Sequence, residues 1–341
     1  MTSQCQPERA RPTNHRAAGQ TRPRVTVITP AYNVANYIGE AIDSVLGQSI
    51  SDFEYLIIDD GSSDRTVDEI LRRISEDSRA RLITMNHAGA SAARNAGIMQ
   101  ARGDFISFLD GDDRWHPTFL EKQLALLESL GPDVAAVFAR ARVMSESGRV
   151  YLLRWQRAGR YDFDDMLIRA CPPRTGSSLL IRASAFSADR LFRDLKSAQD
   201  LDMWLRIQRD SGMPYFWGGN KYLLDIRVRP GAISRDHQAR FAALESLIRD
   251  HSLDLRRYPR NLAYVRPSVF AYRSGADDVA DRWALAVRQI GWRMLVLDSY
   301  GWRVLAWSSL TPRYRKLLRS ASGVARSFVG CLVGAGGAVL R

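Results

Sequence analysis

The sequence predicts an α/β fold with a mainly parallel sheet flanked by helices, and three observations support this fold class. Over residues 24–130, apolar and β-branched runs alternate with segments whose apolar residues recur at helical spacing, a pattern typical of βαβ units. Apolar residues make up 45% of the 341-residue chain and charged residues 25%, an ordinary composition for a protein with a sizeable core. Polar clusters directly follow three of the expected strands, and parallel sheets bind ligands at that edge.

The first half of the chain contains four expected strands separated by helices. Order begins at Val25–Thr29, a β-branched run that ends at Pro30. The later strands are expected at 53–58, 81–85 and 104–109, and the helices at 35–47, 64–75, 91–100 and 115–130. Asp64 is a candidate N-cap for the second helix, and Pro117 fits the first turn of the fourth.

The second half is less regular. Strands are expected at 134–141, 150–153, 178–182 and 222–228, with a turn at 145–149. One helix is expected at 201–209, and the pattern from residue 236 onward is helical. Trp115 and Trp204 lie in expected helices with apolar faces, where a core position is favoured over a sugar-stacking one.

These patterns divide the chain into four regions. A disordered basic tail is expected at 1–22 and an α/β domain at 23–235, followed by a helical region at 236–312 and a basic and apolar tail at 313–341. The last tail has two open interpretations. Its basic cluster can hold an anionic membrane surface while the short apolar stretch lies on the bilayer, or the tail is a frayed end.

The net charge of +12 suggests nucleic acid or an anionic membrane as a partner, but this charge is concentrated at the two ends of the chain. Residues 1–24 carry +4 and residues 313–341 carry +6, which leaves +2 for the body. Two of the three polar clusters at the expected strand ends are acidic, so they would repel a phosphate backbone. We therefore expect no nucleic-acid partner.

Three cysteines, Cys5, Cys171 and Cys331, lie far apart and without CxxC spacing. This argues against a disulfide framework or structural zinc site and favours a reducing compartment. The N-terminus lacks the apolar region of a secretory signal, and no stretch reaches the roughly 20 apolar residues that span a bilayer. We expect a cytoplasmic protein, either free or peripheral on the inner face of the cell membrane.

Carboxylates gather where two of the expected strands end. Asp110 and Asp112 follow the fourth strand, and Asp60 lies in the cluster after the second. Two carboxylates at this spacing can converge on Mg²⁺ or Mn²⁺, hard cations that bind carboxylate oxygens and share phosphate ligands with a substrate. A solvated turn is the common alternative for such segments, and the second acidic cluster nearby favours the metal. Asp60 can also hydrogen-bond a nucleotide base or ribose.

Other familiar site motifs are missing from the sequence. No GxGxxG or GxxxxGK[ST] string follows the first strand, which argues against a dinucleotide or P-loop site. GxSxG is absent and the five histidines are scattered, so a Ser-His-Asp hydrolase has no support. His87 and His116 border the expected site loops, and we interpret them as surface or capping residues.

Four motifs occur in order between residues 24 and 130: VTVITPAYN (25–33), DDGSSD (59–64), GASAARNAG (89–97) and FLDGDD (108–113). In these motifs the chain resembles the family 2 glycosyltransferases, whose bacterial members commonly build cell-surface polysaccharides or lipid-linked glycans. The similarity continues more loosely through SAQDLDMWLR (197–206) to RVRPGAIS (227–234). It implies the GT-A fold, a Rossmann-like α/β fold, for residues 23–235, with a helical C-terminal appendage.

The resemblance also implies an activity, the inverting transfer of a sugar from a nucleotide-diphosphate donor to a hydroxyl of a glycan or lipid-linked acceptor. Asp112 would be the ligand of Mn²⁺ or Mg²⁺, with Asp110 near the ribose and the metal. Asp200 matches the base that deprotonates the acceptor hydroxyl. The other donor-binding residues that it implies are Asp60 at the base, Pro30 and Tyr32 beside it, Arg94 near the diphosphate, and Arg227.

Two departures from the family pattern, and one missing signature of its processive members, change these expectations. Gln199 precedes Asp200 where the family usually has glutamate, so Asp202 becomes a rival for the base. Arg229 stands where relatives often have a histidine; an arginine there can hold phosphate but removes a metal ligand. The QxxRW signature of processive members is missing, which favours a single addition over the synthesis of long chains.

Two other functions remain open at the level of sequence. A nucleotidyltransferase can share a related fold but needs a Gly-rich loop with Arg and Lys after the first strand, which PAYNVANYIG (30–39) does not provide. A catalytically silent nucleotide-sugar-binding or membrane-scaffold protein would keep the same motifs without turnover.

Overall fold

The computed structural model describes residues 22–154, 156–168, 175–195 and 197–229, together with positions 243, 246, 247, 250 and 251. The basic tail predicted at 1–22, apart from its last residue, lies outside the described residues, and so does the tail predicted at 313–341. Nearly all of the helical region predicted at 236–312 also lies outside them.

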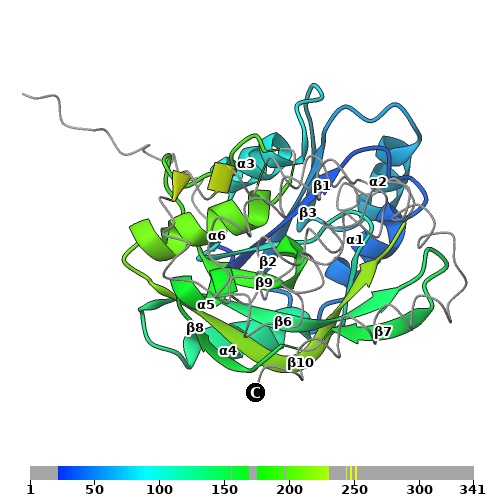
Figure 1. Ribbon diagram of the computed structural model, residues 1–341. Helices are drawn as coiled ribbons and strands as arrows, with labels where there is room; N and C mark the ends of the chain where they lie inside the picture. Colours follow the sequence, from blue (N-terminus) through cyan, green and yellow to red (C-terminus); the bar gives the residue numbers. More distant parts are fainter. Residues whose placement is uncertain are drawn as a thin grey trace, which may run out of the picture.

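A mixed sheet of ten strands forms the centre of the described part of the chain (Figure 1). Its first half is parallel, with β3 (Ala80–Thr84), β2 (Phe53–Asp59), β1 (Val25–Ala31) and β4 (Phe105–Phe108) side by side in that order. β9 (Leu179–Arg182) is inserted next and runs antiparallel to both β4 and β6 (Val134–Met144). β10 (Tyr215–Arg227) pairs in parallel with β6, and β5 (Arg114–Trp115), β7 (Val150–Arg154) and β8 (Gly159–Tyr161) complete the sheet.

Helices cover both faces of the sheet. In β1, Val25 and Val27 belong to one apolar cluster and Ile28 to the other, because successive strand side chains point to opposite faces. The first cluster draws on α1 (Ile38–Leu46), α2 (Thr66–Ile74) and α4 (Phe119–Glu128), and the second on α3 (Ala90–Gln100), α5 (Phe163–Ile168) and α6 (Gln199–Asp210). Figure 1 shows α1 and α2 to the right of the central strands and α3 and α6 to the left. These three layers confirm the predicted fold class.

The helix predicted over 115–130 is wrong at its start. Trp115 lies in the short strand β5 and pairs with Leu224 of β10, and α4 begins only at Phe119. Trp115 is buried, as predicted, and stacks on Phe119 with ring centroids 4.1 Å apart. Pairing with a strand much later in the chain therefore overrides the local helical pattern. Trp204 is a buried core residue of α6, as predicted.

Three other differences concern the second half of the chain. β10 begins at Tyr215 instead of the predicted residue 222, because register shifts let the strand continue through the Gly218–Tyr222 segment. The short elements β8 and α5 have no counterpart in the sequence prediction. α6 starts two residues earlier than predicted, at Gln199, so that Asp200 lies in its first turn.

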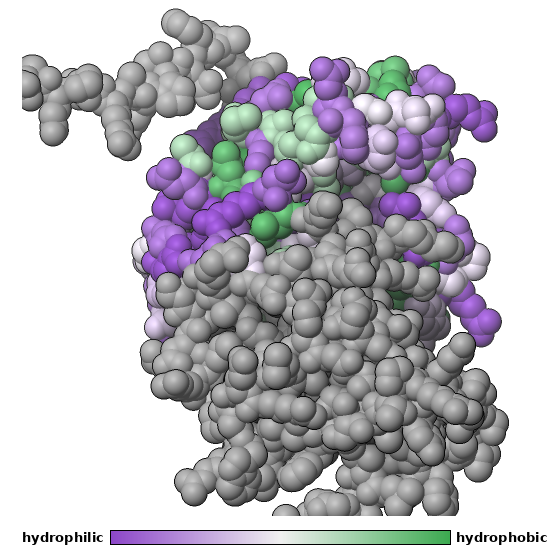
Figure 2. Space-filling model, turned by 45° about the horizontal axis from the view of Figure 1, so that its top comes forward, coloured by the Kyte–Doolittle hydropathy of each residue, from purple (hydrophilic) through white to green (hydrophobic). Residues whose placement is uncertain are grey.

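Figure 2 shows one face, on which hydrophobic residues occupy small separate areas between hydrophilic ones. Tyr151 and Leu152 of β7 are exposed next to each other, whereas Leu71 and Met99 are exposed on α2 and α3. Within the described ranges, no helix has both the length and the apolar character needed to cross a membrane.

Candidate active site

The loops that follow β1, β2 and β4 meet at one edge of the sheet. The parallel register pairs Ala31 with Asp59 and Ile28 with Phe108, so the three strands end beside one another. The polar clusters predicted at these strand ends are therefore neighbours. Pro30 lies in the last part of β1. A Cβ on Gly111 would come within 3.2 Å of Val34 Cγ2 and of Ile38 Cδ1, so glycine at position 111 lets the loop after β4 lie close to the segment that follows β1.

Asn33 ties the loop after β1 to the loop after β2. Its Oδ1 accepts hydrogen bonds from the backbone N of Ser63 at 2.8 Å and of Asp64 at 3.3 Å. Its own backbone N donates to the Oγ of Ser62 at 3.0 Å. Asn33 has a φ of 49°, a left-handed conformation that asparagine tolerates better than most residues. The next carboxylate, Asp64, accepts from the backbone N of Thr66 at 2.9 Å and so satisfies an amide in the first turn of α2.

Asp60 is buried and shapes the loop that leads into α3. Its carboxylate accepts hydrogen bonds from the backbone N of Ala88 at 2.8 Å and of Gly89 at 2.9 Å. His87 Nδ1 lies 2.9 Å from Asp60 Oδ2, and the His87 ring stacks on Tyr32 with centroids 4.1 Å apart. Tyr32 is 43% exposed and Asp60 only 2%. The accessible surface of this corner therefore belongs to the aromatic pair. His87 is a surface residue, as predicted, but its stacking on Tyr32 and its contact with Asp60 were not predicted.

Asp110 is held from three sides at the end of β4. Its Oδ1 accepts a hydrogen bond from Arg94 Nη2 at 2.6 Å, and its Oδ2 accepts one from Thr175 Oγ1 at 3.4 Å. Its backbone N donates to Ser177 Oγ at 3.0 Å. The buried guanidinium of Arg94 also lies over the Phe192 ring, 5.5 Å from its centroid. The structure thus brings together Arg94 and Asp110, two residues predicted separately for the donor site, and the segment just before β9 supports them.

Asp112 and Asp113 are held by the end of β10. The backbone O of Asp112 accepts from Arg227 Nε at 3.1 Å, and its carboxylate Oδ2 accepts from Arg229 Nε at 2.5 Å. Asp113 is buried, and its Oδ1 accepts from the backbone N of Arg227 at 3.0 Å. The predicted metal ligand Asp112 is therefore already paired with an arginine.

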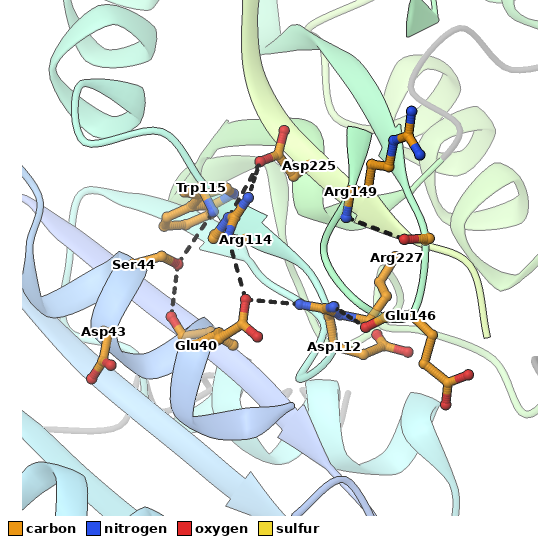
Figure 3. A network of polar contacts seen from close by, with 12 residues as sticks. Glu40, Asp43, Ser44, Asp112, Arg114, Trp115, Glu146, Arg149, Asp225 and Arg227 are labelled. Atoms are coloured by element: carbon orange, nitrogen blue, oxygen red, sulfur yellow. Dashed lines mark hydrogen bonds and ion pairs between the residues drawn. The ribbon is translucent and has the colours of Figure 1, made fainter. Parts of the chain in front are cut away.

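Arg227 sits in a polar network that Figure 3 shows from close by. Its guanidinium donates to Glu40 Oε2 at 2.9 Å and to the carbonyl of Glu146 at 2.5 Å, besides its bond to the Asp112 carbonyl. Glu40 in turn pairs with Arg114, which binds Asp225 of β10 at 2.9 Å. The Arg227 side chain is only 1% exposed. All three nitrogens of this guanidinium are bonded to protein, so its visible role is to fasten the loop after β4, and its predicted contact with the donor remains a prediction.

Asp200 and Asp202, the two candidates for the base, have different environments. Asp200 Oδ2 accepts a hydrogen bond from the backbone N of Gly176 at 3.1 Å. Its Oδ1 is buried and has no hydrogen-bond partner among the described residues. Asp202 is fully buried and pairs with Arg206 Nη2 at 2.8 Å and with His251 Nε2 at 3.3 Å. Of the two, only Asp200 has a carboxylate oxygen without a hydrogen-bond partner among the described residues.

The pKa values of these carboxyls follow their environments. Burial raises the pKa of Asp200, and Arg94 only partly opposes this. Burial and the charge of Asp110 raise the pKa of Asp112. Burial and the charges of Asp112 and Asp110 raise the pKa of Asp113 well above the ordinary aspartate range. Asp202 behaves oppositely, because the hydrogen bond from His251 and the pairing with Arg206 lower its pKa although burial favours a rise.

The segment Thr175–Ser178 connects the acidic loop to the candidate base. Ser177 holds Asp110, the neighbouring Gly176 holds Asp200, and the Ser177 carbonyl accepts from Trp115 Nε1 at 2.7 Å. From the sequence, these small polar residues indicate only a turn before a strand. Their position beside Asp110 and Asp200 follows from the insertion of β9 between β4 and β6, which the sequence does not predict.

The donor set at Asp110 and Asp112 suits a divalent cation that a substrate helps to hold. The described residues contain no group of three or more His, Cys, Asp or Glu side chains able to enclose a metal ion. Two carboxylates on one loop are nevertheless the usual protein contribution to Mg²⁺ or Mn²⁺ sites completed by water and substrate phosphates. The residues fit such an ion, provided that Arg229 releases the Asp112 carboxylate.

Comparison with known proteins supports the assignment that the motifs suggest. Residues 26–189 match the model of the family "Glycosyl transferase family 2". The putative teichuronic acid biosynthesis glycosyltransferase TuaG of Bacillus subtilis is 30% identical over 220 residues, which cover 62% of this chain and 82% of TuaG. A glycosyltransferase of Rickettsia bellii is 31% identical over 192 residues, 55% of this chain but only 28% of that longer protein.

Solved structures agree on the fold. S. aureus TarS 1–349 in complex with UDP-GlcNAc superposes with a TM-score of 0.60 at 17% identity, covering 87% of this chain and 88% of that one. The mannosyltransferase PcManGT from Pyrobaculum calidifontis, in complex with GDP-Man and Mn²⁺, gives a TM-score of 0.54 at 18% identity, covering 88% and 87%. The predicted GT-A fold is therefore confirmed. Given the extent of the match to TuaG and the family motifs on the strand ends, the chain belongs to glycosyl transferase family 2.

Proposed function

We propose that this protein catalyses the inverting, divalent-cation-dependent transfer of one sugar from a nucleotide-diphosphate donor to an acceptor hydroxyl. One observation carries the proposal. Asp200 Oδ1 is buried without a partner among the described residues, and Arg94 lies close enough to both Asp200 and Asp110 for their charges to raise its pKa against the effect of burial. A carboxylate oxygen that has no described partner thus lies near the acidic loop, which supports base-assisted transfer.

The donor would lie along the edge formed by the loops after β1, β2 and β4. The stacked rings of Tyr32 and His87 offer an exposed aromatic surface for a base, with Pro30 beside it and Asp60 holding the loop behind. Arg94 supplies positive charge near the diphosphate, and Asp110 faces the ribose and the cation. Arg227 contributes by fixing the acidic loop, whether or not it also meets the donor.

Mn²⁺ or Mg²⁺ would be held by Asp112, with Asp110 nearby. When bound, such a cation neutralises the negative charge that develops on the departing diphosphate. PcManGT, a fold neighbour, has been solved with GDP-Man and Mn²⁺, and TarS with UDP-GlcNAc. These complexes support the ligand class and leave the base and the sugar open.

Asp200 would perform the proton transfer. Its free Oδ1 takes the proton of the acceptor hydroxyl as the acceptor oxygen attacks the anomeric carbon. The bond between that carbon and the diphosphate oxygen breaks on the opposite face, the nucleoside diphosphate leaves with the electron pair, and the configuration inverts. The bond from Gly176 N to Oδ2 keeps the carboxylate oriented throughout. The burial that raises the pKa of Asp200 makes it a stronger base than an exposed aspartate.

The acceptor is proposed to be a growing polysaccharide or a lipid-linked glycan. The name of the relative TuaG refers to teichuronic acid biosynthesis, which supports a cell-surface product. The basic tail at 313–341 would then hold the enzyme at the anionic inner face of the cell membrane. Deleting this tail should move the protein from the membrane pellet to the supernatant; a full-length chain that stays soluble at low salt would refute the attachment.

A donor screen tests the proposed activity. The full chain is incubated with Mn²⁺ and a panel of UDP-, GDP- and dTDP-sugars, and release of the nucleoside diphosphate is measured with and without acceptor extract. We expect turnover with one donor class and its loss on adding EDTA or on Asp112→Ala. A protein that binds a nucleotide sugar but never turns it over, under any metal, would instead be the silent binding protein.

A further inference from the structure

Arg229 is the nearest cation to Asp112 among the contacts that the structure describes. Its Nε lies 2.5 Å from Asp112 Oδ2, a short charge-assisted hydrogen bond. The arginine side chain is 30% exposed and the aspartate side chain 19% exposed. Both partners of this ion pair are partly exposed to solvent, so an incoming ligand can reach them.

Arg229 is held differently from its neighbour Arg227. Arg227 is 1% exposed and donates from all three nitrogens to fixed protein acceptors. Arg229 makes this one described hydrogen bond, and its guanidinium otherwise lies 5.9 Å from the ring centroid of Tyr37. It also lies two residues beyond the end of β10, outside the strand ladder that fixes Arg227. Among the described contacts of the two arginines, Arg229 has the smaller set to give up.

We propose that Arg229 is a resident counter-ion of Asp112, which a divalent cation must displace before the donor site is complete. The inference rests on the proposed function, because it takes Asp112 to be the cation's ligand. A guanidinium on one carboxylate oxygen and a divalent cation on the other would be two positive charges a few ångströms apart. Their repulsion makes the two occupants alternatives rather than companions.

Release of Arg229 has a second consequence. The planar guanidinium that leaves Asp112 can donate two hydrogen bonds at once to the phosphate oxygens of a bound diphosphate. The donor would then stabilise the displaced arginine, and the cation would stabilise the donor. By linkage, the nucleoside diphosphate should raise the affinity for the cation, and part of that coupling should depend on Arg229.

Direct cation binding tests the exchange without using activity. The loss of the free Mn²⁺ signal in electron paramagnetic resonance gives the Kd of the full chain for Mn²⁺, without donor. We expect Arg229→Ala to bind Mn²⁺ about three- to tenfold more tightly, the gain expected when one partly exposed charge pair no longer competes. Arg229→Lys keeps a competing charge and should stay close to the wild type. Adding UDP or GDP should tighten Mn²⁺ binding more in the wild type than in Arg229→Ala.

Asp112→Asn separates the two ways in which the idea can fail. If Asp112→Asn loses Mn²⁺ binding but Arg229→Ala binds no more tightly than the wild type, the counter-ion role is refuted and the proposed cation site stands. If Asp112→Asn binds Mn²⁺ as well as the wild type, the cation site itself is wrong and the inference falls with it. Thermal melting of each variant, and Arg229→Gln as a second neutral replacement, guard against an effect of misfolding.

Discussion

Replacing Asp200 by asparagine removes the proposed base while changing little else. The two side chains have the same shape, and an asparagine oxygen can still accept the hydrogen bond that Gly176 N gives to Oδ2. The other oxygen has no partner among the described residues to lose. The substitution removes the attraction between Asp200 and Arg94, but Arg94 keeps its ion pair with Asp110. Asparagine is also neutral, so its burial costs less than that of a carboxylate. We therefore expect Asp200→Asn to fold with an unchanged melting temperature.

The expected loss lies in the chemical step. A positioned general base contributes about 10²- to 10⁴-fold to a rate, which corresponds to roughly 3–5 kcal/mol of activation free energy. Because Asp200 contacts the acceptor hydroxyl in the proposed mechanism and not the nucleotide, kcat should carry this loss. The KM for the donor should stay within about threefold of the wild type, since uniform binding is not removed.

Asp202→Asn is the matched control, since it lies in the same helix. Asp202 is fully buried against Arg206, whose side chain is 3% exposed. Removing its charge leaves a buried guanidinium unpaired, which typically costs about 3–5 kcal/mol, or roughly 6–20 °C in melting temperature. Folded Asp202→Asn should keep most of its kcat. If Asp200→Asn retains wild-type kcat in a coupled nucleoside-diphosphate release assay while Asp202→Asn loses it, the assignment of the base is refuted.

Three further outcomes follow from the same geometry. Trp115→Ala should lower the free energy of unfolding, measured in urea, by about 3–5 kcal/mol. Trp115 is buried, stacks on Phe119 and donates a hydrogen bond to the Ser177 carbonyl. A loss below about 1 kcal/mol would contradict its core position. Arg227→Lys keeps the charge, but a lysine cannot reach Glu40, Asp112 and Glu146 at the same time as Arg227 does. The loop after β4 would be held less firmly, so kcat/KM for the donor should fall by about tenfold or more. A wild-type kcat/KM would show that this loop does not need the arginine. In the pH profile of kcat/KM, the loss of activity on the acid side should occur at a pH above the ordinary aspartate pKa of about 4. Burial raises the pKa of Asp200, and only the ionised carboxylate accepts a proton. A loss that occurs only at or below pH ~4 would argue against Asp200 as the base.

The parallel half of the fold could be read from the sequence because its signals are local. β1 and β2 are continuous apolar runs, each ended by a polar cluster, and the strand boundaries differ from the prediction by at most two residues. β5 could not be read in this way, because Trp115 takes its strand conformation from pairing with Leu224, far along the chain. The Gly218–Tyr222 segment looks like an interruption, yet register shifts there carry β10 through it.

The residues of the candidate site could be predicted where they stand in sequence motifs, but not where their positions depend on packing. Arg94 and Asp110 stand in motifs, and the structure pairs them at 2.6 Å. Choosing between Asp200 and Asp202 needs burial and partners, although the Asp202–Arg206 spacing of four residues was a readable sign of a helical ion pair. Ser177 and His87 gain their places from the loops that fold against them, which no local pattern reports.

The insertion of β9 between β4 and β6 also sets an order of events during synthesis. Until residues 179–182 emerge from the ribosome, β4 and β6 each have an edge that β9 will later cover, and such open edges readily pair with other chains. The pairing of β9 with β4 joins residues far apart in the chain, and contacts of this kind form slowly. Ser177 lies directly before β9 and Asp200 after it, so the candidate active site can form only late in synthesis. A nascent chain stalled before this point would expose the open edges and be prone to aggregation.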